Sequence, residues 1–208
     1  QLVRQLKAAG AVITVKLNCD QFAYHPTGAT SEYGPSRNPW NPEVISGGSS
    51  GGTGVAIATG MVYAGLGSDT GGSIRLPAAI CGVVGIKPTY GRVSLEGVRP
   101  LSQTFDTPGP MARTTLDAVA MLQAMADPAT EETARAANRM ALATSEIEAG
   151  LEGLRVGAPS NYFFENNADE VNAAVRGALD TFAMLGAELV AVDIAGIDEM
   201  ISAQIGIA

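Results

Sequence analysis

The chain has 208 residues, of which 46% are hydrophobic and 16% charged, and its net charge is −8. This composition is typical of a globular protein with a substantial core. It argues against direct nucleic-acid binding, which needs a basic surface, and no apolar run is as long as a membrane span. One histidine and two cysteines without ligand spacing give little support to metal catalysis, and we expect reduced thiols in a cytoplasmic protein.

Both ends of the sequence lie inside helical patterns. Apolar residues share one face from Leu2 to Ala9 with no cap and no initiator methionine before them, and the last residues, 198–208, read as a helix without a stop signal. We therefore expect residues 1–208 to be part of a single domain that lacks N-terminal and C-terminal segments.

The first part of the chain predicts short elements separated by loops. A helix over 2–9 ends at Gly10, and the apolar, partly β-branched run Ala11–Val15 predicts a buried strand. A short helix is expected over 17–22, followed by a long surface loop over 24–46 that is rich in Pro, Gly, Asn and Ser. The next expected elements are a buried helix over 53–61, a strand over 62–68, a helical turn over 73–80, a strand over 82–86, a proline-bearing loop over 106–113 and a helix over 114–126.

The last part of the chain predicts an α/β alternation. Residues 127–150 are rich in Ala, Glu and Thr and are expected to be a solvated helix pair or a connecting excursion. Beyond them we expect strands over 154–158 and 187–193 and helices over 169–185 and 197–207. Strands that alternate with helices imply a largely parallel sheet covered on both faces.

Two serine–glycine clusters carry the chemical signal. They are Gly-Gly-Ser-Ser-Gly-Gly at 47–52 and Asp-Thr-Gly-Gly-Ser-Ile-Arg at 69–75, and fifteen of the 25 glycines lie between Gly47 and Gly109. A glycine-flanked serine offers an exposed hydroxyl with backbone N–H groups beside it that can hold an oxyanion. The helix expected after the first cluster would also point its N-terminus at Ser49 and Ser50, which favours a nearby negative charge.

Two other chemistries fit less well. Gly47–Gly51 matches the G-x-S-x-G nucleophile elbow, but that fold needs an acid and a histidine after the serine, and His25 lies before it. Neither of the glycine-rich phosphate-binding motifs, G-x-x-x-x-G-K-[ST] and G-x-G-x-x-G, occurs in the sequence. A serine activated by a neutral, buried lysine remains.

The run from Gly47 to Arg113 resembles the amidase signature family. Its blocks follow the family pattern in order: Gly-Gly-Ser-Ser-Gly-Gly, then Gly-Ser-Asp-Thr-Gly-Gly-Ser-Ile-Arg-Leu-Pro-Ala, then Cys-Gly-Val-Val-Gly-Ile-Lys-Pro-Thr-Tyr-Gly-Arg-Val-Ser, then Gly-Pro-Met-Ala-Arg. The resemblance implies an α/β fold, an α/β/α sandwich with a mixed, largely parallel central sheet, here incomplete.

The resemblance also implies a Ser–cis-Ser–Lys triad without a metal or organic cofactor. Ser73 would be the nucleophile, and Ser49, after a cis Gly48–Ser49 bond, would bridge it to the lysine. The remaining implied roles are oxyanion binding by the amides of Thr70, Gly71, Gly72 and Ser73, bracing of that loop by Asp69 and Arg75, and support of Ser49 by Ser50.

The catalytic lysine of this triad has no match in the sequence. The family's lysine lies in an apolar stretch that ends Lys-Asp or Lys-Glu, whereas Lys7, Lys16 and Lys87 are followed by Ala, Leu and Pro. We expect it in a missing N-terminal part, so that this fragment alone is inactive.

The implied reaction is hydrolysis of a small-molecule amide through a serine acyl-enzyme. Two alternatives stay open: the amidase-type component of a glutamyl-tRNA amidotransferase, which makes ammonia for a partner that holds tRNA, and a remnant that keeps the fold without the chemistry. The expected partners accordingly include a second copy of the chain or amidotransferase subunits, with no direct nucleic-acid contact and no membrane.

Overall fold

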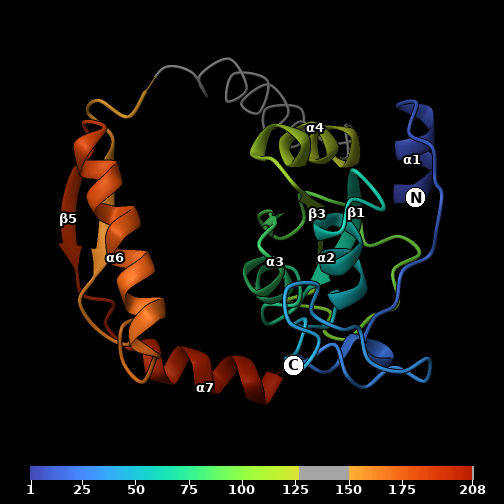
Figure 1. Cartoon of the computed structure of the whole chain (residues 1–208), viewed down its shortest axis with the longest axis horizontal. Helices are drawn as coiled ribbons and strands as arrows, with labels where there is room; N and C mark the ends of the chain where they lie inside the picture. Colours follow the sequence, from blue (N-terminus) through green and yellow to red (C-terminus); the bar gives the residue numbers. More distant parts are fainter. Residues whose placement is uncertain (127–149, 208) are drawn as a thin grey trace. The chain divides into compact units, whose positions relative to one another are not determined.

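The computed structural model describes residues 1–126 and 150–207, which belong to two compact units (Figure 1). The first unit comprises the described residues up to 126, and the second comprises residues 150–207. The excursion predicted over 127–150 lies outside the described residues except for Gly150. A single domain stays a prediction.

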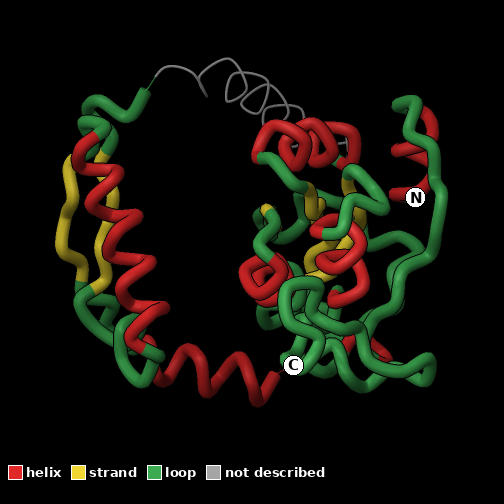
Figure 2. Tube along the Cα trace, viewed as in Figure 1, coloured by secondary structure: helices red, strands yellow, loops and turns green. Residues whose placement is uncertain are grey.

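The first unit is built on a three-stranded sheet of order β1-β3-β2. Strands are drawn in yellow in Figure 2. The strands are β1 (Ala64–Asp69), β2 (Val84–Gly85) and β3 (Thr107–Ala112). Both pairings are antiparallel, with Ala64 opposite Ala112 and Asp69 opposite Thr107 at the two ends of the β1–β3 ladder. Among the described residues, the parallel pairing that we expected occurs only in the second unit, so strands of both orientations are present.

The central strand β3 was expected to be a loop because it contains two prolines, and that prediction is wrong. The amide of Ile86 donates to the carbonyl of Pro110 at 3.0 Å, so the even-numbered residues of β3 direct their backbone polar groups toward β2. The missing N–H groups of Pro108 and Pro110 therefore face the side where only two residues of β2 pair. The odd-numbered residues keep the ladder with β1 intact.

Among residues 1–126, four helices pack around this sheet: α1 (Leu2–Ala8), α2 (Gly51–Ala58), α3 (Arg75–Cys81) and α4 (Thr115–Met125). One buried cluster joins α1, α4 and Val93 and receives Leu66 of β1. The other joins α2 and α3 to Met111 of β3. Side chains of a strand alternate between its faces, so the two clusters lie on opposite faces of the sheet.

Two predictions near the N-terminus are wrong. Residues 11–15 form no strand, and Val12 is 84% exposed. A strand needs a hydrogen-bonded neighbour, and the part of the chain that the structure describes offers this segment none. The helix expected over 17–22 is only a 3₁₀ turn, η1 (Gln21–Ala23). The long loop over 24–46 is confirmed, apart from a single bridge between Arg37 and Ile45.

The second unit confirms the predicted α/β alternation. Strands β4 (Arg155–Pro159) and β5 (Glu188–Val192) pair in parallel, with Arg155 opposite Glu188. Helix α6 (Asp169–Met184) connects them and packs on β5, and α7 (Ile197–Ile207) follows. Among the helices of the described residues, none has the length and apolar character to cross a bilayer.

Candidate active site

The two serine–glycine clusters meet at one place in the first unit. The amide of Ser50 donates to the carbonyl of Ser73 at 3.2 Å. Ser50 is the residue before α2, and Ser73 lies in the turn that links the end of β1 to the start of α3. The fold thus brings together two segments that are more than twenty residues apart in the sequence.

Three glycines let the second cluster lie directly on the sheet. A Cβ placed on Gly67, Gly85 or Gly109 would lie within 2.9 Å of a side-chain atom of Ile74, which is fully buried. Since real Cβ atoms do not approach other atoms so closely, only glycine permits this packing. Ile74 directly follows Ser73, so these glycines determine how close the expected nucleophile, Ser73, lies to the sheet.

Ser49 is held by a loop that folds around Asp20. The Gly48–Ser49 peptide bond is cis, as expected, and Ser49 is 1% exposed. The amide of Asp20 donates to the Ser49 carbonyl at 3.1 Å, and that of Gly48 donates to the carbonyl of Pro26 at 2.8 Å. The fully buried Asp20 carboxylate accepts from the amide of Gly28 at 2.7 Å and from the amide of Thr30 at 2.8 Å. Sequence reasoning missed Asp20.

The Ser50 hydroxyl is bound to β1. It accepts from the amide of Ser68 at 3.3 Å and donates to the Ser68 carbonyl at 3.5 Å. Ser50 therefore anchors the first cluster to the strand that leads into the second. A hydrogen bond from its hydroxyl to Ser49, the expected form of support, is not among these contacts.

Asp69 braces the turn between β1 and α3, together with Arg75. Its carboxylate is fully buried and accepts from the Arg75 guanidinium at 2.9 and 3.0 Å. It also accepts from the amides of Gly72 at 2.8 Å and Ile74 at 3.2 Å. Burial by itself raises the pKa of Asp69, but the hydrogen bond and charge of Arg75 and the amide donors outweigh burial and lower the pKa below its ordinary value.

The amides expected to bind an oxyanion differ in whether they already donate a hydrogen bond. The amide of Gly72 is committed to Asp69. Among the described residues, the amides of Gly71 and Ser73 donate to no acceptor, and Gly71 is exposed while Ser73 is half-buried. The hydroxyl of Thr70 donates to the carboxylate of Asp106, a residue that sequence reasoning also missed. The geometry therefore favours Gly71 and Ser73 over Gly72 as oxyanion donors.

The expected proton transfer from Ser73 through Ser49 to a lysine depends on the serine hydroxyls and on the lysines. Within the described ranges, neither the Ser49 nor the Ser73 hydroxyl makes a hydrogen bond, so their direct contact stays a prediction. The Lys87 ammonium donates to the Pro88 carbonyl at 2.9 Å and to Thr107 Oγ1 at 3.5 Å. Lys7 and Lys16 are exposed, which is unlike the buried, neutral lysine that a base requires.

Among the described residues, neither Cys81 nor His25 forms a competing site. Burial raises the pKa of the Cys81 thiol, which donates to the carbonyl of Ser46 at 3.3 Å, so this cysteine is a poor nucleophile. The ring of His25 lies edge-on to Tyr24, 5.2 Å between centroids. In the part of the chain that the structure describes, no three His, Cys, Asp or Glu side chains are grouped as metal ligands.

The comparisons with known proteins agree with one another. A family model described as Amidase matches residues 1–208. The A subunit of glutamyl-tRNA(Gln) amidotransferase from Myxococcus xanthus is 47% identical over 193 residues, which cover 93% of this chain and 40% of that protein. The chain thus spans about two fifths of the length of the curated relatives it matches.

Two solved structures show the same fold. The A subunit of glutamyl-tRNA(Gln) amidotransferase from Thermotoga maritima has a TM-score of 0.89 and 36% identity, covering 100% of this chain and 46% of that one. The native peptide amidase of Stenotrophomonas maltophilia has a TM-score of 0.86 and 35% identity, covering 98% of this chain and 43% of that one.

Proposed function

Because the chain belongs to the amidase family, we propose that the protein containing it hydrolyses carbon–nitrogen amide bonds through a serine acyl-enzyme. The observation that carries this proposal is the meeting of the two serine–glycine clusters through the Ser50 amide and the Ser73 carbonyl. It puts Ser73 in a tight glycine turn where two amides have no other acceptor among the described residues, as an acyl-transfer nucleophile requires.

The chemical steps follow from these groups. The Ser73 hydroxyl oxygen attacks the amide carbonyl carbon, while its proton passes through the Ser49 hydroxyl to a neutral lysine. The amides of Gly71 and Ser73 hold the oxyanion of the tetrahedral intermediate. The C–N bond then breaks, the nitrogen takes the proton back and leaves as ammonia or an amine, and water hydrolyses the Ser73 ester to release the acid.

The proposal assigns the base to a lysine outside these 208 residues. The exposure of Lys7 and Lys16 and the contacts of Lys87 support this assignment. The three lysines can be tested as single variants of the complete gene product. Lys7→Met, Lys16→Met and Lys87→Met should each leave kcat within about threefold of wild type. A loss of a thousandfold or more in one of them would identify the base and refute the assignment.

The rest of the proposal concerns the setting of the reaction. The substrate is a small-molecule amide, no metal or organic cofactor takes part, and the protein works in the cytoplasm without direct contact to nucleic acid or membrane. Residues 1–208 would be part of a single amidase domain, in a protein that acts alone, as a homodimer or with amidotransferase subunits.

A glutaminase that feeds an amidotransferase is the second candidate. It is favoured by the identity of 47% to the A subunit of a glutamyl-tRNA(Gln) amidotransferase. Ammonia release from glutamine, measured with and without the amidotransferase subunits of the organism that makes this protein, separates the two candidates. Turnover of diverse amides without any partner supports the general amidase, whereas glutamine turnover that needs the partners supports the amidotransferase component.

The nucleophile is tested with three alanine variants of the complete gene product. Ser73→Ala should abolish amide turnover, and Ser49→Ala should lower kcat by at least a thousandfold, since each breaks the relay. Ser202→Ala, an exposed serine of α7, is the matched control and should retain the wild-type rate. Turnover by the Ser73→Ala protein near the wild-type rate would refute the proposed function.

A further inference from the structure

Thr70 and Asp106 lie opposite each other because of the register of the sheet. The β1–β3 ladder ends with Asp69 opposite Thr107. One more step along the two antiparallel strands brings Thr70, the first residue of the nucleophile turn, opposite Asp106, the residue before β3. The Thr70 hydroxyl donates to Asp106 Oδ1 across this gap, as a cross-strand pair does.

The Asp106 carboxylate is buried and is held by hydrogen bonds alone. It is 5% exposed, and its Oδ2 accepts from the amides of Leu101 at 2.7 Å and Ser102 at 3.0 Å. Unlike Asp69, it forms no ion pair within the described residues. A buried carboxylate without a cation depends on each of its donors, so its bond to the Thr70 hydroxyl has the strength of a charge-assisted contact.

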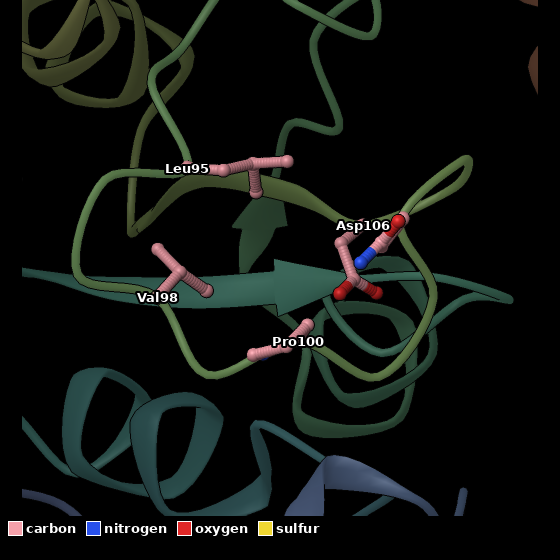
Figure 3. Close-up of a pocket in the computed structure, with 5 residues that line it drawn as sticks. Leu95, Val98, Pro100 and Asp106 are labelled. Atoms are coloured by element: carbon pink, nitrogen blue, oxygen red, sulfur yellow. The ribbon is translucent and has the colours of Figure 1, made fainter.

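An apolar pocket lies beside this contact. The pocket has a volume of about 190 Å³ and is lined by Leu95, Val98, Pro100 and Gln103 together with Asp106. Figure 3 shows the side chains of Leu95, Val98 and Pro100 around the pocket, with Asp106 across from Leu95 and Val98. This volume is below the range of about 300–1,000 Å³ that is usual for ligand pockets, so it suits a support better than a binding site.

We propose that Asp106 is a positioning residue that holds Thr70 so that the Gly71 amide stays aimed at the oxyanion. Gly71 and Gly72 form the most pliable part of the turn and need an anchor on each side. Asp69 anchors the downstream side through the amides of Gly72 and Ile74. Asp106 anchors the upstream side through Thr70. This inference rests on the proposed function for its effect on rate, but the anchoring itself does not.

The test uses four variants of the complete gene product. Thr70→Val removes the hydroxyl at nearly constant shape, Thr70→Ser keeps it, Asp106→Asn removes the charge, and a double variant combines Thr70→Val with Asp106→Asn. The matched control is Asp117→Asn, because the Asp117 carboxylate also accepts from a threonine hydroxyl, that of Thr114, at 2.7 Å, but at the start of α4.

The first readout is steady-state kinetics. Thr70→Val and Asp106→Asn should each lower kcat about tenfold with KM within twofold, since the oxyanion forms only in the transition state. Asp117→Asn should retain wild-type kcat, and Thr70→Ser should lose less than Thr70→Val, because serine keeps the hydroxyl that donates to Asp106. The kcat of the double variant should fall by no more than about tenfold, because both single changes remove the same contact between Thr70 and Asp106. Wild-type kcat in Thr70→Val, or losses that multiply in the double variant, would overturn the inference.

The second readout is amide hydrogen exchange of a peptide that covers residues 69–75, which needs no turnover. Exchange there should be at least fivefold faster in Thr70→Val and Asp106→Asn than in wild type, and unchanged in Asp117→Asn. Unchanged exchange in Thr70→Val overturns the inference even if the enzyme is active. If the wild-type protein hydrolyses no amide but exchange is still faster in Thr70→Val and Asp106→Asn, the anchoring is supported and the proposed function is refuted.

Discussion

One added methyl group at Gly67 should disturb both the core and the candidate site. A Cβ there would lie 2.8 Å from Ile74 Cγ1 and 2.9 Å from Ser50 Oγ. Ile74 has little room to move aside, because it is fully buried and a Cβ placed on Gly85 or Gly109 would lie as close to its side chain. The Gly67→Ala protein must therefore separate β1 from the residues next to both serines.

The expected cost follows from overpacking. Forcing a methyl group into a packed core costs about 1–3 kcal/mol, and the stiffer unfolded chain returns about 0.4–1 kcal/mol. With a net loss of about 1.5 kcal/mol and a urea dependence of about 2 kcal/mol per molar, the unfolding midpoint of Gly67→Ala should fall by about 0.75 M. A displaced Ser73 should also lower kcat by tenfold or more.

Urea unfolding followed by tryptophan fluorescence tests this prediction, because Trp40 is the only tryptophan and its indole N–H donates to the Cys81 carbonyl at 2.8 Å. Gly177→Ala in α6 is the control: its Cβ would meet no atom within 4 Å, so its helical circular dichroism should resist urea as well as wild type or better. A wild-type midpoint for Gly67→Ala, or an equal loss in the Ile74→Ala background, would refute the packing argument.

Three further changes have defined outcomes. The lowered pKa of Asp69 contributes stability above about pH 3.9, and this stability is lost as the pH falls through the folded pKa. Arg75→Gln raises the folded pKa of Asp69, so acid unfolding of this variant should begin at a higher pH than that of wild type. Identical acid unfolding curves would contradict this. Trp40→Phe loses the bond to the last carbonyl of α3 and should cost about 1 kcal/mol in thermal unfolding. Thr114→Ala removes the N-cap of α4 and should cost about 1 kcal/mol, whereas Thr115→Ala should cost less than half of that.

Patterns local in sequence predicted most of the helices and the α/β alternation of the second unit. The apolar period over 114–126 was enough to place α4. The prolines of β3 misled the prediction, because whether a proline fits a strand depends on which side its missing N–H faces, and only the pairing decides that. The run 11–15 misled it in the opposite direction, since β-branched composition cannot supply a strand partner.

The candidate site was predictable only as far as motifs reach. The glycine and serine spacing located Ser49 and Ser73, and the family resemblance gave their expected roles. Asp20 and Asp106 carry no local signal, because each acts on a backbone segment brought to it by the fold. Their burial, which only the folded chain shows, is what distinguishes them from the exposed aspartates.

The two carboxylates beside the nucleophile turn differ in what compensates their burial, and this difference suits their places. Asp69 has the cation of Arg75 and binds the downstream amides, so its charge persists to low pH. Asp106 relies on neutral donors and binds the upstream hydroxyl of Thr70. Between these anchors, the amides of Gly71 and Ser73 donate to no acceptor among the described residues. A turn fixed at both ends by buried charges can leave those two donors unpaired without collapsing onto them, which is the condition for a preorganised oxyanion site.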